Sequence, residues 1–226
     1  MTMQRTYRLI LGAAVLSASC AVPIETGPPI ADPAATAARL LERSGADAPA
    51  RVRFGWSYGD RRGDIDGEGV ARYNPADSLR LDLFTSGDVA LSVSLAGERL
   101  GVLGEIEDIE IPPRSFLFAM AGLFRPEDGV APAGFEAGQD TVLVYGAAER
   151  KLYFTARGGR LVKVEERRGS HLERRVELTW SGAGDWPSRA EFRDFDEPSR
   201  VRWTIGETRT METPYPTDIF LLDRVP

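Results

Sequence analysis

Apolar and polar residues alternate with a period of two along most of the chain from residue 51 onward. The clearest alternation lies in Arg51–Gly59, which places Val52, Phe54, Trp56 and Tyr58 on one face of an extended strand. Similar segments, joined by short turns rich in Gly, Pro, Asp and Ser, predict further strands at 67–74, 79–84, 89–95, 99–108, 140–147, 150–157, 159–168, 171–180, 189–195 and 200–207. The pattern predicts a mainly β protein with a few helices: an antiparallel meander of about ten or eleven strands with one apolar face.

An amphipathic helix is predicted ahead of the first strand, over Asp32–Ala46. Asp32 suits the N-cap, Pro33 suits the first turn and Gly45 suits the end of the helix. Because its apolar face is modest, we expect this helix to pack against a larger element.

A second predicted helix, Pro112–Phe124, interrupts the strands and is apolar on nearly all sides. Ser115 is a candidate cap, and the segment that follows, 125–139, is typical of a loop. A helix without a polar face must be buried, and in a sheet-rich protein the natural place is inside the curve of the sheet. We expect it to act as a lid there through its large apolar side chains, which are Phe116, Leu117, Met120, Leu123 and Phe124.

Residues 1–19 have the organisation of a secretory signal. Arg5 and Arg8 make a charged start, Leu9–Leu16 is apolar, and Ser17–Ser19 supplies small residues before a cleavage point. The apolar run is shorter than the roughly 20 residues that span a bilayer. A cleaved signal is therefore favoured over a transmembrane anchor.

The only cysteine, Cys20, follows this segment directly. Leu16–Cys20 resembles the lipobox of bacterial lipoproteins, which implies cleavage before Cys20, a lipid on its sulfur and anchoring to a membrane. By the same resemblance, Ala21 favours the outer membrane, with the folded part facing the periplasm. The alternative is an ordinary signal peptide with a chance cysteine. Residues 20–31 are Pro-rich and predict an extended tether, which leaves 32–226 as a single folded domain.

Acidic residues outnumber basic ones by 34 to 28, and the formal net charge is −6. An acidic chain has no electrostatic reason to bind nucleic acid. One Cys and one His exclude a Cys/His zinc site within the chain, and no G-x-S-x-G motif presents a serine to His171 for a catalytic triad. We therefore expect no enzymatic activity, no metal and no cofactor.

Three charged segments could be functional sites, but a structural interpretation is favoured for each. Asp64–Gly69 is more typical of a turn than of a calcium loop. Asp194–Arg200 and Glu165–Arg175 are interpreted as a solvated hairpin tip and an exposed hairpin of mixed charge. A hydrolase that uses the carboxylates of Asp194–Arg200 is the weakest functional alternative.

The order of these elements resembles the LolA/LolB-like superfamily of bacterial periplasmic and outer-membrane proteins. Gly67–Leu83 carries the resemblance through a Gly-x-Gly strand, a turn with proline and the sequence SLRLDL, and Pro214–Leu222 closes the chain. The resemblance covers about Asp32 to Leu222. It implies an unclosed, strongly curved antiparallel β-barrel with helices as a lid over an apolar cavity for acyl chains. The loop at 85–88 lacks the protruding apolar residue of LolB, so the implied role is lipid binding in general.

These expectations lead to a candidate ligand site on the concave face of the sheet. Ligand pockets are mostly apolar with a few polar groups, and the candidate cavity residues are Phe54, Trp56, Tyr58, Leu81, Leu83, Leu91 and Val93. The first hypothesis is a lipid-anchored envelope lipoprotein that binds a lipid or a lipoprotein acyl chain in this cavity. The alternative is a structural or adaptor lipoprotein that binds a protein partner of the cell envelope, with the same side chains forming an ordinary filled core.

Overall fold

The structure is a computed structural model of the 226-residue chain. It describes residues 26–44, 47–75, 78–86, 88–104, 111–126, 131–146, 149–182 and 184–222. The predicted signal segment, Cys20 and the first half of the predicted tether lie outside the described residues. Within the described ranges, no helix is both long and apolar enough to cross a bilayer.

The described residues form twelve strands, two α-helices and one short 3-10 helix. In chain order these are α1 (Pro33–Arg43), β1 (Ala50–Gly59), β2 (Asp64–Asn74), β3 (Ser78–Thr85), β4 (Asp88–Ala96), β5 (Arg99–Gly104), α2 (Arg114–Met120), β6 (Ala133–Ala137), β7 (Asp140–Tyr145), β8 (Arg150–Arg157), β9 (Arg160–Arg168), β10 (His171–Thr179), β11 (Arg189–Asp194), β12 (Ser199–Thr210) and η1 (Thr217–Phe220).

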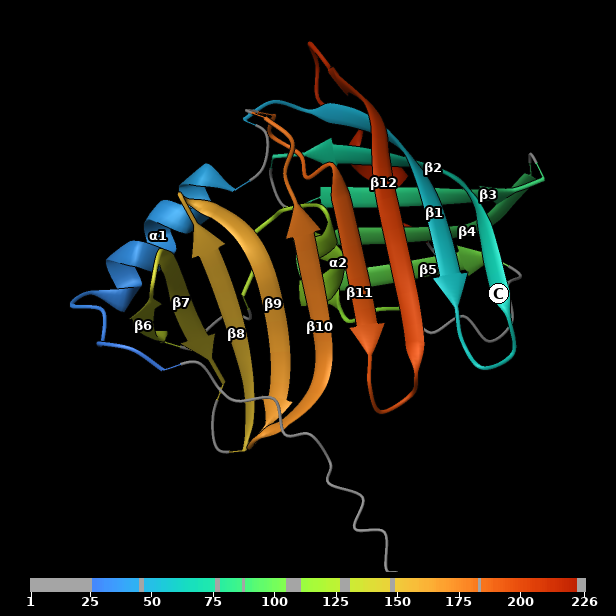
Figure 1. The fold of residues 1–226 in the computed structure, drawn as a ribbon. Helices are drawn as coiled ribbons and strands as arrows, with labels where there is room; N and C mark the ends of the chain where they lie inside the picture. Colours follow the sequence, from blue (N-terminus) through green and yellow to red (C-terminus); the bar gives the residue numbers. More distant parts are fainter. Residues whose placement is uncertain are drawn as a thin grey trace, which may run out of the picture.

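All twelve strands belong to one antiparallel sheet, in the order β5-β4-β3-β2-β1-β12-β11-β10-β9-β8-β7-β6. The edge strands β5 and β6 do not pair with each other, so the sheet is not closed into a barrel. In Figure 1, β3 to β5 run across the view, β8 to β11 run down it, and α2 lies inside the curve between these two parts. The predicted fold, an unclosed antiparallel barrel with a helix inside its curve, is confirmed.

Strand β6 corrects the prediction of a loop over 125–139 and brings the number of strands to twelve. Its sequence, AGFEA, has one bulky apolar residue and a glycine, so alternation gives no signal there. Pairing on both sides defines the strand instead. β7 pairs on one side, and on the other Ile30 N donates to Gly134 O at 3.0 Å and Glu136 N donates to Pro28 O at 2.9 Å. The segment before α1 thereby covers a sheet edge that would otherwise present unpaired backbone groups.

Helix α1 begins as its sequence predicts. Asp32 is the N-cap, and its Oδ1 accepts a hydrogen bond from Ala35 N at 2.8 Å. The helix packs near β6, with Leu40 buried in the core. Beyond its last turn, Ser44 Oγ accepts a hydrogen bond from Arg125 at 3.1 Å, which ties the end of α1 to the segment that follows α2.

The Gly-x-Gly pair of β2 makes room for two aromatic side chains of β1. Phe54 lies directly opposite Gly69, and Trp56 lies opposite Gly67. A Cβ on Gly69 would overlap the Phe54 ring, and one on Gly67 would overlap the backbone oxygen of Phe84. Gly69 therefore leaves room for the Phe54 ring, and Gly67 leaves room for the backbone of β3 and for the indole nitrogen of Trp56. These close approaches give the Gly-x-Gly sequence a steric reason.

The other face of β3 and β4 is covered by the carboxyl-terminal segment. Arg80 donates to Ile219 O at 2.9 Å, and Asn74 exchanges two hydrogen bonds with the backbone of Tyr215, each 3.0 Å long. Beneath this cover lies the buried carboxylate of Asp82, 4% exposed. It accepts from Arg72, from Arg80 Nε at 2.9 Å and from Ser92 Oγ at 2.6 Å.

We predict that Asp82→Ala lowers the free energy of unfolding by about 2–4 kcal/mol, because it leaves two arginines without their buried counter-charge. Urea unfolding followed by circular dichroism measures the change. The matched control is Asp66→Ala, which removes an exposed carboxylate from β2 and should change the free energy by less than about 0.5 kcal/mol. Equal unfolding midpoints for the two variants would contradict the importance of this contact.

Candidate functional site

An apolar slot lies on the concave face of the sheet between strands β1, β3, β4 and β12. Six of the seven predicted cavity residues line it together with five others, the full set being Trp56, Tyr58, Leu81, Leu83, Leu91, Val93, Ile111, Pro112, Leu117, Val201 and Trp203. The seventh, Phe54, lies outside the slot and packs against Trp203, with ring centroids 4.9 Å apart. The indole N–H of Trp56 donates to Glu68 O at 2.9 Å, so its polar group is satisfied by the backbone.

The slot is almost filled by its own walls. About 40 Å³ remains inside it, which is close to the volume of one water molecule in the liquid, about 30 Å³. Pockets for small molecules have about 300–1,000 Å³. An acyl chain can therefore enter only if a wall of the slot moves.

The predicted lid residues are buried together in the concave face. Phe116, Leu117, Met120, Leu123 and Phe124 are each at most 3% exposed. α2 packs against β9, β10 and β11, with the Phe116 ring edge-on to Phe192 at 5.6 Å and the Phe124 ring edge-on to Phe154 at 5.0 Å. Of the five lid residues, Leu117 is the one that reaches the slot.

The ends of α2 differ from the sequence prediction. The N-cap is Pro113 rather than Ser115, and no side chain caps the helix. α2 ends at Met120, before the predicted end at Phe124, because Gly122 adopts a positive φ of 79° and Leu123 N donates back to Phe118 O at 2.9 Å. A side chain on Gly122 would press on Trp180 and Pro187, so this turn fixes the path of the lid.

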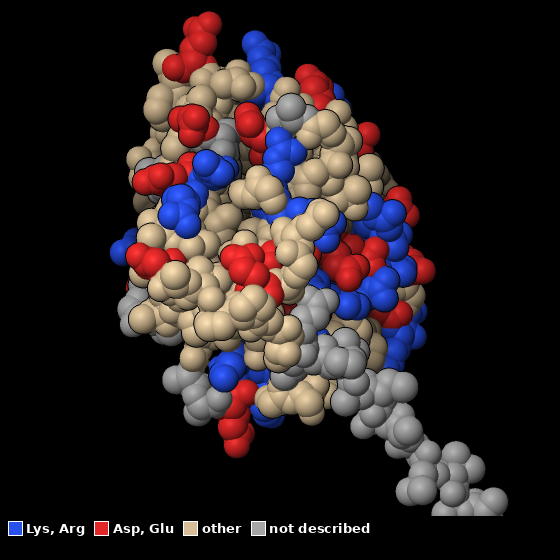
Figure 2. Space-filling model, turned by 60° about the vertical axis from the view of Figure 1, so that its left-hand side comes forward, with Lys and Arg blue, Asp and Glu red and all other residues tan. Residues whose placement is uncertain are grey.

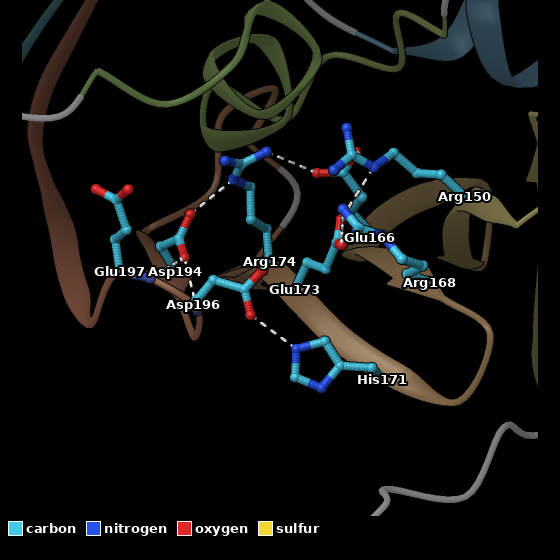
Figure 3. A network of polar contacts seen from close by, with 9 residues as sticks. All are labelled: Arg150, Glu166, Arg168, His171, Glu173, Arg174, Asp194, Asp196 and Glu197. Atoms are coloured by element: carbon cyan, nitrogen blue, oxygen red, sulfur yellow. Dashed lines mark hydrogen bonds and ion pairs between the residues drawn. The ribbon is translucent and has the colours of Figure 1, made fainter.

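The concave face becomes polar at one end, where Arg174, Asp194 and Ser199 lie side by side on β10, β11 and β12. Arg174 donates to Asp194 at 2.7 Å and to Glu166 at 3.0 Å. Burial lowers the pKa of Arg174, but these hydrogen bonds outweigh burial and hold the pKa above its ordinary value. Figure 3 shows this network below α2.

Glu173 extends the network toward β8 and β9. Its carboxylate, 2% exposed, lies 3.0 Å from Arg150 Nε and 2.6 Å from Arg168 Nη2. These contacts are ion pairs without aligned hydrogen-bond geometry, since neither carboxylate oxygen of Glu173 has a hydrogen-bond partner among the described residues. Two arginines thus neutralise a buried acid.

The predictions of a solvated tip at Asp194–Arg200 and an exposed hairpin at Glu165–Arg175 are therefore wrong for several of their charges. Asp194, Glu165, Glu166 and Glu173 are buried. A bulge at Leu172/Arg174 breaks the two-residue alternation, so sequence spacing no longer separates the inner face from the outer face. His171 remains exposed and contacts Asp196, its Nε2 2.7 Å from Oδ1.

A wider, polar hollow of about 400 Å³ adjoins the slot. Tyr58 lines both spaces, and the hollow continues along the β1–β2 turn and the β11–β12 turn. These two turns lie at the same end of neighbouring strands (Figure 1). The apolar slot and the polar hollow thus have Tyr58 as a shared wall.

The described part of the chain offers no grouping of three or more His, Cys, Asp or Glu side chains that could hold a metal ion. Figure 2 shows acidic and basic side chains interspersed over one face, without an extended area of one sign. That face does not present the basic surface that binds nucleic acid.

Comparison with known proteins identifies the fold. No protein-family model matches the sequence, and no curated protein matches it either. A LolA superfamily protein from Nitrosomonas europaea is similar in structure, with a TM-score of 0.55 and 11% identity over 85% of this chain and 98% of that chain. A domain from Vibrio parahaemolyticus, described as an outer-membrane lipoprotein-sorting protein domain, has a TM-score of 0.55 and 10% identity over 82% of this chain and 94% of its own.

A DUF1329 family protein from Desulfovibrio piger has a TM-score of 0.59 and 8% identity, covering 84% of this chain and all of the other, 100%. At such low identities the similarity concerns the fold. It extends over nearly the whole length of each similar structure. The chain has the unclosed, curved sheet with an enclosed helix that is found in LolA-like proteins, as its sequence predicts.

Proposed function

We propose that this chain is an envelope lipoprotein that binds a lipid or a lipoprotein acyl chain on the concave face of its sheet. The apolar slot carries this proposal, since nearly all of its walls are hydrocarbon or aromatic rings. Acyl chains need an apolar space of suitable shape and no catalytic group. The proposed activity is accordingly binding, as in a carrier, a receptor or a protein that maintains the envelope.

The fold supports the same proposal. A similarly folded domain is named for the sorting of outer-membrane lipoproteins, a process whose cargo carries acyl chains. In the present chain Leu117 and the segment 111–112 form part of the wall of the slot. We infer that a ligand displaces this part of the lid, because the space left in the slot is otherwise too small.

A second candidate function follows from the tight filling of the slot. With about 40 Å³ left and the lid fully buried, the same side chains make a packed core that needs no ligand. In that case the domain is a structural or adaptor lipoprotein whose outer surface binds a protein partner of the envelope. The two candidates differ in one measurable property, which is the binding of an acyl chain.

The full chain carrying Cys20→Ser, purified without added lipid, should bind a fluorescent fatty acid and retain co-purified lipid in native mass spectrometry. Leu91→Trp, which fills the slot, should weaken fatty-acid binding by at least about tenfold, since the added ring occupies the ligand's space. The matched control is Leu100→Trp on β5, where the leucine is 46% exposed. It should bind as the parent chain does.

Leu83→Phe is a milder filling of the same slot and serves if Leu91→Trp unfolds, which urea midpoints will reveal. Binding that is equally strong in the parent chain, the slot variants and the control would move the ligand site elsewhere. A parent chain that is free of lipid and binds no fatty acid would leave the adaptor function.

We also propose that Cys20 is the lipidated first residue of the mature chain and that the first part of the predicted 20–31 tether, ahead of the pairing of residues 28–30 with β6, links the folded domain to the outer membrane, facing the periplasm. The observation behind this part is the sequence Leu16–Cys20 after an apolar run. Two or three acyl chains anchor a protein stably, since each buried CH₂ contributes about 0.8 kcal/mol.

Cells that express the chain should incorporate labelled palmitate into it, and Cys20→Ser should abolish the label, because the chain has one cysteine. Cys20→Ser should also remove the protein from the outer-membrane fraction. The control is Ser17→Ala, a small-for-small change that should preserve labelling. Equal label in the parent chain and in Cys20→Ser would eliminate the anchor.

A further inference from the structure

The polar hollow beside the slot has the position of a head-group site. We call it the mouth, and it is formed by residues 58–62 of β1 and the β1–β2 turn and by residues 196–199 between β11 and β12. Tyr58 belongs to both the mouth and the slot. A molecule with its chain in the slot and its polar end in the mouth would pass over Tyr58. With about 400 Å³, the mouth is large enough for a charged head group.

Two carboxylates in the mouth already have partners within the chain. Arg62 donates to Asp60 Oδ2 through Nε at 2.9 Å and through Nη2 at 2.6 Å. The side-chain hydrogen bond from Arg62 is the largest contribution that lowers the pKa of Asp60 to about 2, so this carboxylate stays ionised. Asp196 is paired with His171 at 2.7 Å.

Two opposite charges remain at the rim, Arg61 and Glu197. Both side chains are exposed, and neither makes an ion pair or a side-chain hydrogen bond with another described residue. Figure 3 shows the Glu197 carboxylate without a contact to the other residues drawn. The mouth thus offers a guanidinium, which suits phosphate, and a carboxylate, which suits an ammonium group.

Inside the rim lies a polar atom that also has no partner. Ser199 is 8% exposed, and its Oγ makes no hydrogen bond with the described part of the chain. Ser199 continues the inner-face row of Val201 and Trp203 on β12, two slot residues. A buried hydroxyl without a partner is uncommon in folded proteins. Ser199 lines the mouth, and an ester or phosphate oxygen there would accept its hydrogen bond once a small local shift uncovers the Oγ.

We propose that the mouth binds the head group of a zwitterionic phospholipid whose acyl chain lies in the slot. This inference rests on the proposed lipid-binding function and adds the class of ligand to it. Arg61 faces the phosphate and Glu197 faces the ammonium group. A head group with negative charge alone would meet Glu197 as a like charge, which opposes binding.

Competition between two lipids with identical short acyl chains tests this assignment. The full chain carrying Cys20→Ser is loaded with a fluorescent fatty acid, which is then displaced by dihexanoyl phosphatidylethanolamine or by dihexanoyl phosphatidylglycerol below their micelle concentrations. The zwitterionic lipid should bind about five- to tenfold more tightly, a size expected for two partly exposed charge contacts.

Three variants sharpen the test. Glu197→Arg should reverse the preference toward the anionic phosphatidylglycerol, and Arg61→Gln should weaken both lipids by about three- to fivefold because each loses its phosphate contact. Glu98→Arg is the control, since it makes the same charge change at an exposed position in the turn between β4 and β5. It should leave the preference unchanged.

Failure of this inference differs from failure of the proposed function. If both lipids displace the fatty acid equally and Glu197→Arg changes nothing, the head-group assignment is overturned while acyl-chain binding stands. A reversal by Glu98→Arg as large as that by Glu197→Arg would also overturn it, because the effect would come from net charge. If neither lipid nor fatty acid binds, lipid binding itself fails.

Discussion

The need to cover the concave face of an unclosed sheet is the constraint on which the rest of this structure depends. The strands turn apolar side chains to the inside of a curve that no strand pairing closes, and such a face has to be buried against another element. α2 meets this need because it has no polar face of its own, with residues 115–120 all buried. Neither element can be buried without the other, so the curvature of the sheet and the position of the helix stabilise each other.

The apolar part of the concave face ends at a row of three polar residues, Arg174, Asp194 and Ser199. On β10, β11 and β12, each of these polar residues lies two positions from an apolar residue on the same face. The pairs are Arg174 with Val176, Asp194 with Phe192, and Ser199 with Val201. The polar row is thus the next row of the same inner face. Burying ion pairs contributes little to stability compared with apolar packing. Their effect here is to make the concave face amphipathic along its length. A lipid on this face has one favourable direction, with its polar end toward this polar row.

The sequence predicts the fold well because both the alternation of apolar and polar residues and the residues that cap helices or form turns act locally. Strand β1, the N-cap at Asp32 and the buried helix around Phe118 each follow from the residues within them. β6 could not be predicted, since its pairing partners at 28–30 and in β7 define it. The buried acids were equally hidden. Charged residues indicate exposure unless their counter-charges are known, and those of Glu173 lie on β8 and at the end of β9. Six candidate cavity residues do share one slot, yet the sequence carries no measure of the space between them.

How the lid would open depends on the free-energy cost of exposing its side chains compared with the gain from burying a ligand in the slot. Exposing all five lid side chains would cost on the order of 8–15 kcal/mol, at about 1.5–3 kcal/mol for each. Burial of roughly 10–19 methylenes, at about 0.8 kcal/mol each, would be needed to balance this cost. The cost of exposing Leu117 alone is offset by the burial of only about two to four ligand methylenes. Because Leu117 is the lid residue that touches the slot, local withdrawal beside the slot is the less costly route. The remaining lid residues, packed on Phe192 and Phe154, would then stay in place as part of the core. In the proposed site the same helix would be both a core element and a movable wall.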